Sequence, residues 1–335
     1  MSTNSTNGRS VREAPLAIRS WFGAISYVAP GLAERQAAKL FITPQVRRTP
    51  SPTELHATLL PERSMERRAG ENGPAYPELS SGRIALWSWG RGPTVLLVHG
   101  WAGAAGDMAP IAAELVRAGY RTVLFDMPGH GNSDKRGPTN LLVYIETLTE
   151  LAKLIGPIDT VVAHSLGGCA SAIALGEGSV TARRAVLLAP ALSPWAFSWH
   201  FAKVIGLPAA RVPGMVARTE EIVGRKADSL NAAEAVRGLQ TPALILHDPE
   251  DLDVPFDHGE ALAAAWQDAE FVPRPGVGHR RILKDAATVR EIVGFVTGGQ
   301  EGAEEKSGGA QGARGARGAR GAAGTRAPQG ELQRA

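Results

Sequence analysis

Five short runs of consecutive apolar residues recur through the middle of the chain, and none shows the polar–apolar alternation of a half-exposed strand. They span residues 94–100, 121–126, 158–164, 184–190 and 242–248. Continuous apolar runs of this length are typical of strands buried on both faces of a parallel sheet. Helical patterns that could cover those faces span residues 107–118, 139–155, 165–177, 257–266 and 284–295. The sequence therefore predicts an α/β protein with one mostly parallel, doubly wound sheet.

Two further segments are expected to extend this sheet. Residues 82–90 have the composition of a strand, and we expect it to be antiparallel at the N-terminal edge. Residues 269–275 form the last predicted strand. With 335 residues, 44% of them hydrophobic, the chain can bury one substantial core and still carry long ends.

The two ends of the chain differ from this pattern. Residues 1–79 are predicted to be an N-terminal extension with helices and a polar connector, and residues 80–298 the α/β domain. In the extension, a short apolar run at 21–29 favours a loosely docked amphipathic helix over a signal peptide. Residues 299–335 are rich in glycine, alanine and arginine, and this composition predicts a disordered tail.

Charge and cysteine content argue against several classes of function. The net charge of +3 arises partly from arginines in the tail, so we expect no nucleic-acid partner. A single cysteine, Cys169, excludes an internal disulfide framework and a cysteine-rich metal site, and suits a cytoplasmic protein. We expect Cys169 to be a small core residue. No stretch reaches the length of a membrane span, so no stable membrane insertion is expected. No metal or cofactor is expected.

Ser165 lies where a buried strand meets a helix. The apolar run that ends at His164 leads directly into it, and Gly167 and Gly168 follow. Small residues around a serine at such a junction allow the sharp turn of a nucleophile elbow, and A-H-S-L-G at 163–167 fits G-x-S-x-G with alanine in the first position. Serine is also a common first residue of helices, and the motif by itself leaves that alternative open.

Four more motifs accompany the elbow, and together they resemble the α/β-hydrolase family. LLVHGWAG at 96–103 resembles the family's oxyanion-hole strand and loop, and DMPGHGNSD at 126–134 its proline- and glycine-rich loop. LHDPEDLDVP at 246–255 resembles the acid loop, and PGVGHRRIL at 275–283 the histidine loop. The motifs follow the family's order over about residues 80–298. The resemblance implies a serine nucleophile, an acid and a histidine base.

The resemblance also assigns these roles to residues. Ser165 is the expected nucleophile and His279, in a Gly-x-Gly-His loop after the last strand, the expected base. The pattern D-x-x-V-P selects Asp251 as the acid, with Asp248 at the strand end as the alternative, and Asp253 is read as a solvated loop charge. By the same resemblance, the backbone N–H groups of Trp101 and Leu166 are the expected oxyanion donors.

The regular pattern breaks at about residues 191–237, before the acid-bearing strand, where the resembling family places a helical cap. Trp195 and Trp199 are spaced by four residues, as are Phe197 and Phe201. These four side chains and that of Trp101 are candidates for the substrate pocket. Simple packing of the cap is the equal alternative for each of them.

Three classes of function remain. The first is a serine hydrolase that cleaves a carboxylic ester or thioester of a small to medium, fairly apolar molecule through an acyl-enzyme. The second is an acyltransferase or perhydrolase with the same three residues, and the third a non-catalytic binding protein on this fold. Dehalogenase chemistry needs a carboxylate where Ser165 stands. The fold also accommodates serine enzymes that hydrolyse carbon–carbon bonds, and the sequence implies no oligomeric state.

Overall fold

A central β-sheet organises the described part of the chain. The computed structural model describes residues 13–44, 74–134 and 138–298. Seven strands run in the order β3-β5-β4-β6-β7-β8-β9, and every neighbouring pair except β3–β5 is parallel. The predicted doubly wound, mostly parallel sheet is confirmed. The predicted tail at 299–335, and residues 1–12 and 45–73 of the predicted extension, lie outside the described residues.

The strands match the predicted runs with small shifts at their ends. They are β4 (Thr94–Val98), β5 (Arg121–Phe125), β6 (Ile158–His164), β7 (Ala182–Leu188), β8 (Ala243–His247) and β9 (Ala269–Pro273). Residues 82–90 do not form one strand. They divide into β2 (Gly82–Arg83), which pairs with β1 (Glu78–Leu79), and β3 (Leu86–Trp89), which is the expected antiparallel edge. The interruption lies at Ile84 and Ala85, both fully buried.

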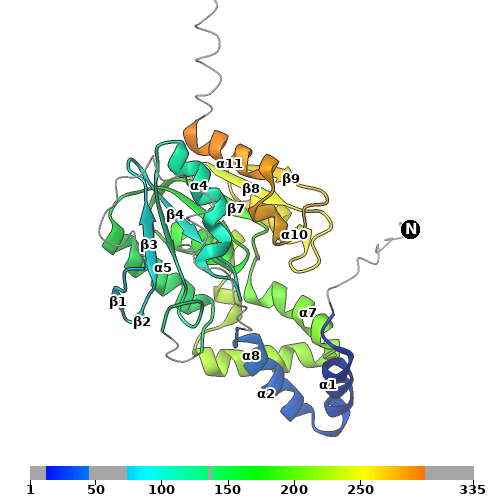
Figure 1. Ribbon diagram of the computed structural model, residues 1–335. Helices are drawn as coiled ribbons and strands as arrows, with labels where there is room; N and C mark the ends of the chain where they lie inside the picture. The colour runs from blue at the N-terminus through cyan, green and yellow to red at the C-terminus, as the bar shows by residue number, and fades with distance from the viewer. Residues whose placement is uncertain (1–12, 45–73, 135–137, 299–335) are drawn as a thin grey trace, which may run out of the picture. The chain divides into compact units, whose positions relative to one another are not determined.

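Helices cover both faces of the sheet (Figure 1). On one face α5 (Leu141–Ile155), α6 (Leu166–Gly176) and α10 (Phe256–Ala265) share a hydrophobic cluster with the strands, to which Tyr144, Ile173 and Leu262 belong. On the other face α4 (Ala109–Arg117) and α11 (Ala286–Thr297) contribute Ile111 and Ile292 to a second cluster. A short helix, α9 (Ala232–Ala235), contacts α6 and α10. Apolar side chains on alternate positions of the strands belong to opposite clusters, which explains why the runs are continuously apolar.

Four helices form a separate layer beyond the carboxyl ends of the strands. We call α1 (Leu16–Val28), α2 (Pro30–Phe41), α7 (Pro194–Ile205) and α8 (Val212–Val223) the helical layer. α2 packs on α8 and α1 on α7, around a third cluster that includes Phe22, Ala37 and Met215. Alanine at contact positions lets helices approach closely. The N-terminal helices thus pack against the insert between β7 and β8, a contact that the sequence did not predict.

Close approach of α6 to β4 fixes the start of this helix. Gly167, in the first turn of α6, has no room for a side chain, because an added Cβ would lie 2.5 Å from the carbonyl oxygen of His99 and 2.9 Å from Val98 Cγ1. At Gly294 in α11, by contrast, an added Cβ would have no neighbouring atom within 4 Å. Both residues are helical, so the two sites differ in packing and not in backbone conformation.

These two glycines make a matched pair for a stability test. We expect Gly167→Ala to lower the free energy of unfolding by about 1–3 kcal/mol, because the new methyl group must displace backbone. Gly294→Ala should raise it by about 1 kcal/mol, since alanine is the better helix former. Chemical denaturation of both variants and the parent measures the difference. Equal stability of the two variants would contradict the packing at Gly167.

Candidate active site

Ser165 sits at a strained turn between β6 and α6. Its backbone has φ 54° and ψ −121°, in a region that non-glycine residues rarely occupy. The turn places the residue against the end of β4, because a Cβ on Gly100 would come 2.8 Å from Ser165 Cβ. Ser165 is buried beside this loop. Strain of this kind costs about 1–3 kcal/mol and is retained where the surrounding structure fixes it.

Loops after β8 and β9 bring a carboxylate and an imidazole to this serine. His279 Nε2 lies 3.1 Å from Ser165 Oγ, and His279 Nδ1 lies 2.7 Å from Asp251 Oδ2. An ionised Asp251 accepts the Nδ1 proton, which leaves the Nε2 lone pair facing the serine hydroxyl. The structure therefore brings together all three residues to which the sequence assigned catalytic roles.

Asp251 is held as a carboxylate. Its Oδ1 accepts hydrogen bonds from the backbone N–H of Asp253, at 2.8 Å, and of Val254, at 2.9 Å. Burial by itself would raise the pKa of Asp251, but hydrogen bonds from His247, His279 and the Val254 N–H outweigh it and hold the pKa well below its usual range. Asp251 thus stays ionised, which suits a residue that orients an imidazole.

Asp248, the alternative acid, has a different set of contacts. Its Oδ2 accepts from the N–H of Gly278 at 2.5 Å, and its Oδ1 from those of Gly276 at 3.3 Å and Glu250 at 2.8 Å. These bonds tie the loop that carries His279 to the end of β8. Among the carboxylates of this loop, Asp251 is the one whose oxygen is hydrogen-bonded to the imidazole.

The two expected oxyanion donors come from different segments: the N–H of Trp101 lies in the loop after β4, and that of Leu166 at the start of α6, directly after Ser165. Neither the N–H of Trp101 nor that of Leu166 has a hydrogen-bond partner among the described residues. The loop is fixed from behind, because the Ala102 N–H donates to His130 Nε2 at 3.1 Å and the Met127 N–H to His99 Nε2 at 2.9 Å. Two free N–H groups beside a serine suit a developing oxyanion.

The remaining described histidines pack around these loops. His164 Nε2 lies 2.9 Å from the carbonyl oxygen of His279 and donates to it, and the two rings are 4.6 Å apart. Burial lowers the pKa of His99 and of His258 to about 4, and the pKa of His164 well below its usual value. These side chains are neutral at pH 7. His56 lies outside the described residues.

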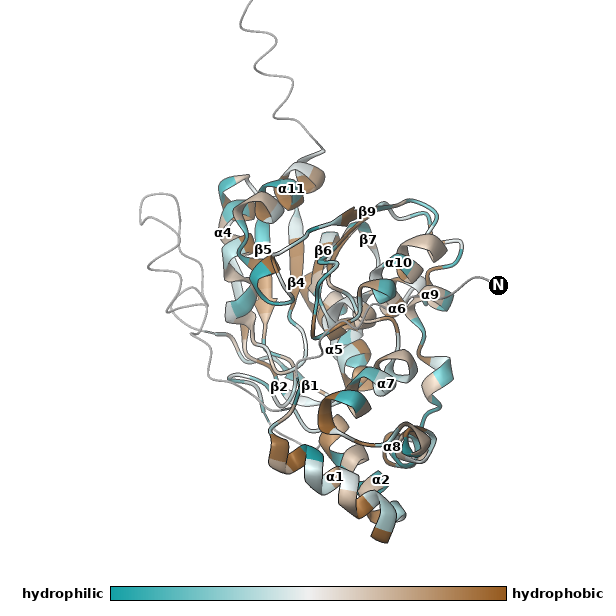
Figure 2. Ribbon diagram, turned by 90° about the vertical axis from the view of Figure 1, so that its right-hand side faces the viewer, coloured by the Kyte–Doolittle hydropathy of each residue, from teal (hydrophilic) through white to brown (hydrophobic). Residues whose placement is uncertain are grey.

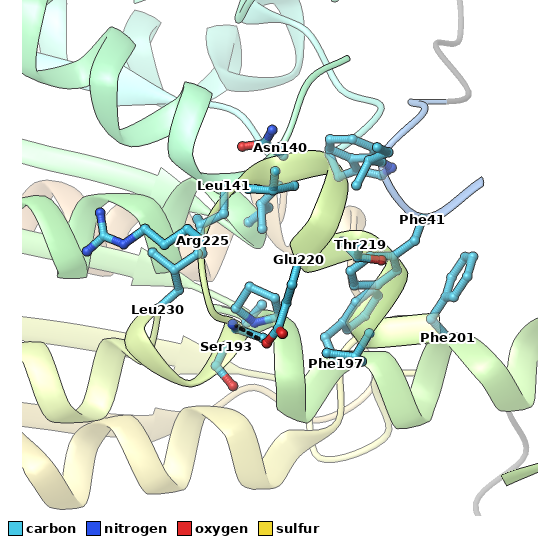
Figure 3. Close-up of a pocket in the computed structure, with 18 of the residues that line it drawn as sticks. Phe41, Asn140, Leu141, Ser193, Phe197, Phe201, Thr219, Glu220, Arg225 and Leu230 are labelled. Carbon is cyan, nitrogen blue, oxygen red and sulfur yellow. Dashed lines mark hydrogen bonds between the residues drawn. The ribbon is translucent and has the colours of Figure 1, made fainter. Parts of the chain in front are cut away.

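A cavity of about 210 Å³ opens beside Ser165 and has a mostly apolar lining. Phe41, Phe197 and Phe201 lie together on one side of it, and Leu141, Arg225 and Leu230 on the other (Figure 3). The Phe41 ring contacts both other phenylalanines, with centroids 6.2 Å and 5.0 Å apart. Trp101 and Leu166 also line the cavity.

Two of the predicted pocket residues do not line this cavity, and several lining residues outside the predicted cap were missed. Trp195 and Trp199 pack edge to face, with centroids 5.8 Å apart, and are not among the lining residues, so their prediction as pocket residues is corrected. They lie on the opposite side of α7 from Phe197, because two residues correspond to about half a helical turn. Phe41 and Ile42 line the cavity from the end of α2, and only their apolar character could have pointed to them.

Cys169 and the acidic groups offer no second site. Cys169 is fully buried on α6, and burial raises the pKa of its thiol to about 12, which suits a core residue. Over residues 13–44, 74–134 and 138–298, no cluster of histidine, cysteine, aspartate or glutamate has the arrangement of a metal site. No helix in the same ranges is long and apolar enough to cross a membrane.

Comparisons with known proteins agree on the fold. The family model described as alpha/beta hydrolase fold matches residues 93–219. The structure resembles the esterase EaEST from Exiguobacterium antarcticum, with 15% identity, a TM-score of 0.53, and coverage of 67% of this chain and 99% of the esterase. It resembles mouse alpha/beta hydrolase domain-containing protein 10, with 18% identity, a TM-score of 0.54, and coverage of 68% and 98%.

A third similar structure is a monoacylglycerol lipase from Paleococcus ferrophilus. It shares 23% identity and a TM-score of 0.51, with coverage of 64% of this chain and 99% of the lipase. Comparison of the sequence with curated proteins gives no significant match. At these identities the structural likeness shows a shared fold alone.

The buried neutral histidines give the stability of the protein a defined pH dependence. His99 and His258 titrate near pH 4 when folded and near 6.5 when unfolded. Between these pH values only the unfolded chain binds a proton at each histidine. The contribution of the two neutral histidines to the unfolding free energy is therefore complete above pH 6.5 and is lost as pH falls towards 4. At pH 4, each histidine should lower the unfolding free energy by about 2–3 kcal/mol relative to its value above pH 6.5.

A histidine variant separates this effect from other titrations. Burial raises the pKa of Asp107 and Asp126, whose effect on stability has the opposite sign. We therefore compare the parent with His258→Gln by urea denaturation at several pH values from 7.5 to 4.5. Between about pH 4.5 and 6, the unfolding free energy of the variant should depend less steeply on pH than that of the parent, by a slope that corresponds to about one proton. Identical slopes would contradict a buried neutral His258.

Proposed function

Because the chain has the alpha/beta hydrolase fold, we propose that it is a serine hydrolase acting on a carboxylic ester or thioester. Ser165 is the nucleophile, His279 the general base and acid, and Asp251 the residue that orients His279. One observation carries the proposal: a continuous chain of hydrogen bonds, Asp251 to His279 to Ser165, ends at an apolar cavity. A binding protein would have no need of this arrangement at a strained serine.

The reaction proceeds in two halves. In the first, His279 Nε2 takes the hydroxyl proton as Ser165 Oγ attacks the carbonyl carbon, and the N–H groups of Trp101 and Leu166 stabilise the oxyanion. His279 then returns this proton to the leaving alcohol or thiol as the acyl bond breaks. In the second, water loses a proton to His279, attacks the acyl-enzyme, and releases the acid as Ser165 regains its proton. Asp251 remains ionised throughout.

The lining of the cavity supports an apolar acyl or alkyl group of small to medium size. Leu141, Phe197 and Leu230 surround the space next to Ser165, and we propose that residues 191–237 act with α2 as a cap over it. The polar side chains of the lining other than Ser165 already have partners within the protein. Those of Asn140 and Ser193 accept from the N–H groups at the starts of α5 and α7. Glu220 accepts from the Ala227 N–H, Arg225 donates to Ser229, and Thr219 donates to the carbonyl of Met215. Apolar contact therefore supplies most of the binding energy.

The nucleophile is tested with a neighbouring serine as control. Ser165→Ala should lower hydrolysis of p-nitrophenyl esters by about 10³-fold or more, because no hydroxyl remains to form the acyl-enzyme. Ser171→Ala removes another buried hydroxyl, from the helix that follows Ser165, and should leave the rate within about twofold, because this hydroxyl has no hydrogen-bond partner among the described residues. A panel of acyl lengths run on the parent measures the size of the acyl site. Undiminished hydrolysis by Ser165→Ala would refute the assignment.

The assignment of the acid is tested by replacing each of two nearby aspartates with asparagine. Asp251→Asn should lower kcat by about 10⁴-fold with little change in KM, because the amide favours the wrong imidazole tautomer. Asp248→Asn removes one of the two oxygens that accept N–H groups of these loops, but it leaves the hydrogen bond between Asp251 and His279 in place and should lose much less. Combining Asp251→Asn with His279→Ala should add little to the worse single variant. A larger loss from Asp248→Asn, or multiplicative losses in the double variant, would reassign the acid.

A further inference from the structure

The outward face of α1 is apolar and has no charged residue. Leu16, Trp21, Tyr27 and Val28 are 76%, 44%, 88% and 84% exposed. With Ala17, Ser20 and Ala24, which are also exposed, they occupy one side of the helix. The opposite side carries the buried residues Phe22 and Ser26, and Phe22 packs among the other helices of the layer. We call the seven exposed residues the α1 face. In Figure 2, α1 is brown at both ends.

This face differs from the scattered apolar residues of ordinary protein surfaces. Four large apolar side chains on three turns of helix, without an intervening charge, make a contiguous patch of the kind that marks an interaction site. Its aromatic members are Trp21 and Tyr27. Tryptophan and tyrosine are the side chains enriched where a hydrocarbon region meets water, because each has an apolar ring and a polar group.

The charge of the molecule is divided between the helical layer and the rest. Residues 13–44 and 194–226, which contain the four helices, carry eight lysines and arginines against four acidic residues. Residues 74–134, 138–193 and 227–298 carry thirteen against twenty-one. These two segments thus have a net charge of +4 and the other described residues −8. An anionic surface would attract the layer and repel the opposite part of the molecule.

Several of the basic side chains are available to such a surface. Arg35 and Lys39 on α2 and Lys203 on α7 are exposed, and no ion pair joins them to another described residue. Juxtaposed basic side chains contribute about 1 kcal/mol each at an anionic bilayer. Apolar insertion and electrostatic attraction therefore act through the same layer.

From these observations we propose that the protein binds peripherally to anionic lipid bilayers through the α1 face. α1 would lie in the interface, as amphipathic helices do, without crossing the bilayer. The same layer contributes Phe41, Phe197 and Phe201 to the cavity beside Ser165. Docking would therefore place the cap of the proposed hydrolase at the lipid surface. The binding itself does not depend on the proposed catalysis.

Binding is measured by sedimentation of the full chain with vesicles. The test compares phosphatidylcholine vesicles with vesicles that also contain about 30 mol % phosphatidylglycerol. We expect binding to the anionic vesicles, weaker binding to the neutral ones, and loss at about 0.5 M salt. A Tyr27→Glu/Val28→Glu variant should bind the anionic vesicles about tenfold more weakly, because both side chains insert. Its melting temperature and p-nitrophenyl ester hydrolysis should be unchanged, since neither side chain is buried.

A control variant carries the same added charge elsewhere. Tyr76→Glu/Leu154→Glu replaces two exposed apolar residues outside the helical layer and should bind as the parent does. Ser165→Ala should also bind normally, so a failure of the proposed catalysis would not be mistaken for a failure of docking. The proposal is overturned if the parent stays in the supernatant with every vesicle. It is overturned equally if the parent is a dimer in light scattering and Tyr27→Glu/Val28→Glu a monomer, because a second copy would then cover the face.

Discussion

The hydrogen bond between Asp251 and His279 is the constraint on which the rest of the site depends. It joins the loop after β8 to the loop after β9, and only in that arrangement does the imidazole reach Ser165 at the end of β6. The parallel sheet makes this possible, because the carboxyl ends of β6, β8 and β9 lie along one edge. Asp248 supports the bond indirectly by anchoring the backbone of the histidine loop.

The helical layer gives this chemistry its surroundings. Phe41 from the N-terminal helices and Phe197 and Phe201 from the insert close the cavity from the side opposite the sheet. The site is thus assembled from three distant parts of the chain: a segment before the sheet, the insert within it, and the loops after its strands. A change at Phe41, at the end of α2, can therefore alter the cavity without touching Ser165, Asp251 or His279.

Much of this could be predicted because the relevant signals are local. Buried parallel strands produce continuous apolar runs, and the elbow at Ser165 requires small residues at fixed offsets. The choice of Asp251 over Asp248 rested on family resemblance, and the geometry agrees with it. The packing of α1 and α2 on α7 and α8 could not be predicted, since contacts between alanine-rich helices leave no pattern that names the partner. The sequence also could not show which side of α7 faces the cavity, because this helix is apolar on more than one side. Trp195 and Trp199 were therefore predicted as pocket residues together with Phe197 and Phe201.

The central claim is that Ser165 is an activated nucleophile, and site-specific labelling tests it most directly. The intact protein would be treated with a fluorophosphonate, digested, and mapped by mass spectrometry. Such reagents react with a serine hydroxyl only when a base has activated it. The account predicts one adduct, on the peptide that contains Ser165, and no adduct after prior unfolding. Labelling at another residue, or none while the protein still hydrolyses esters, would contradict it.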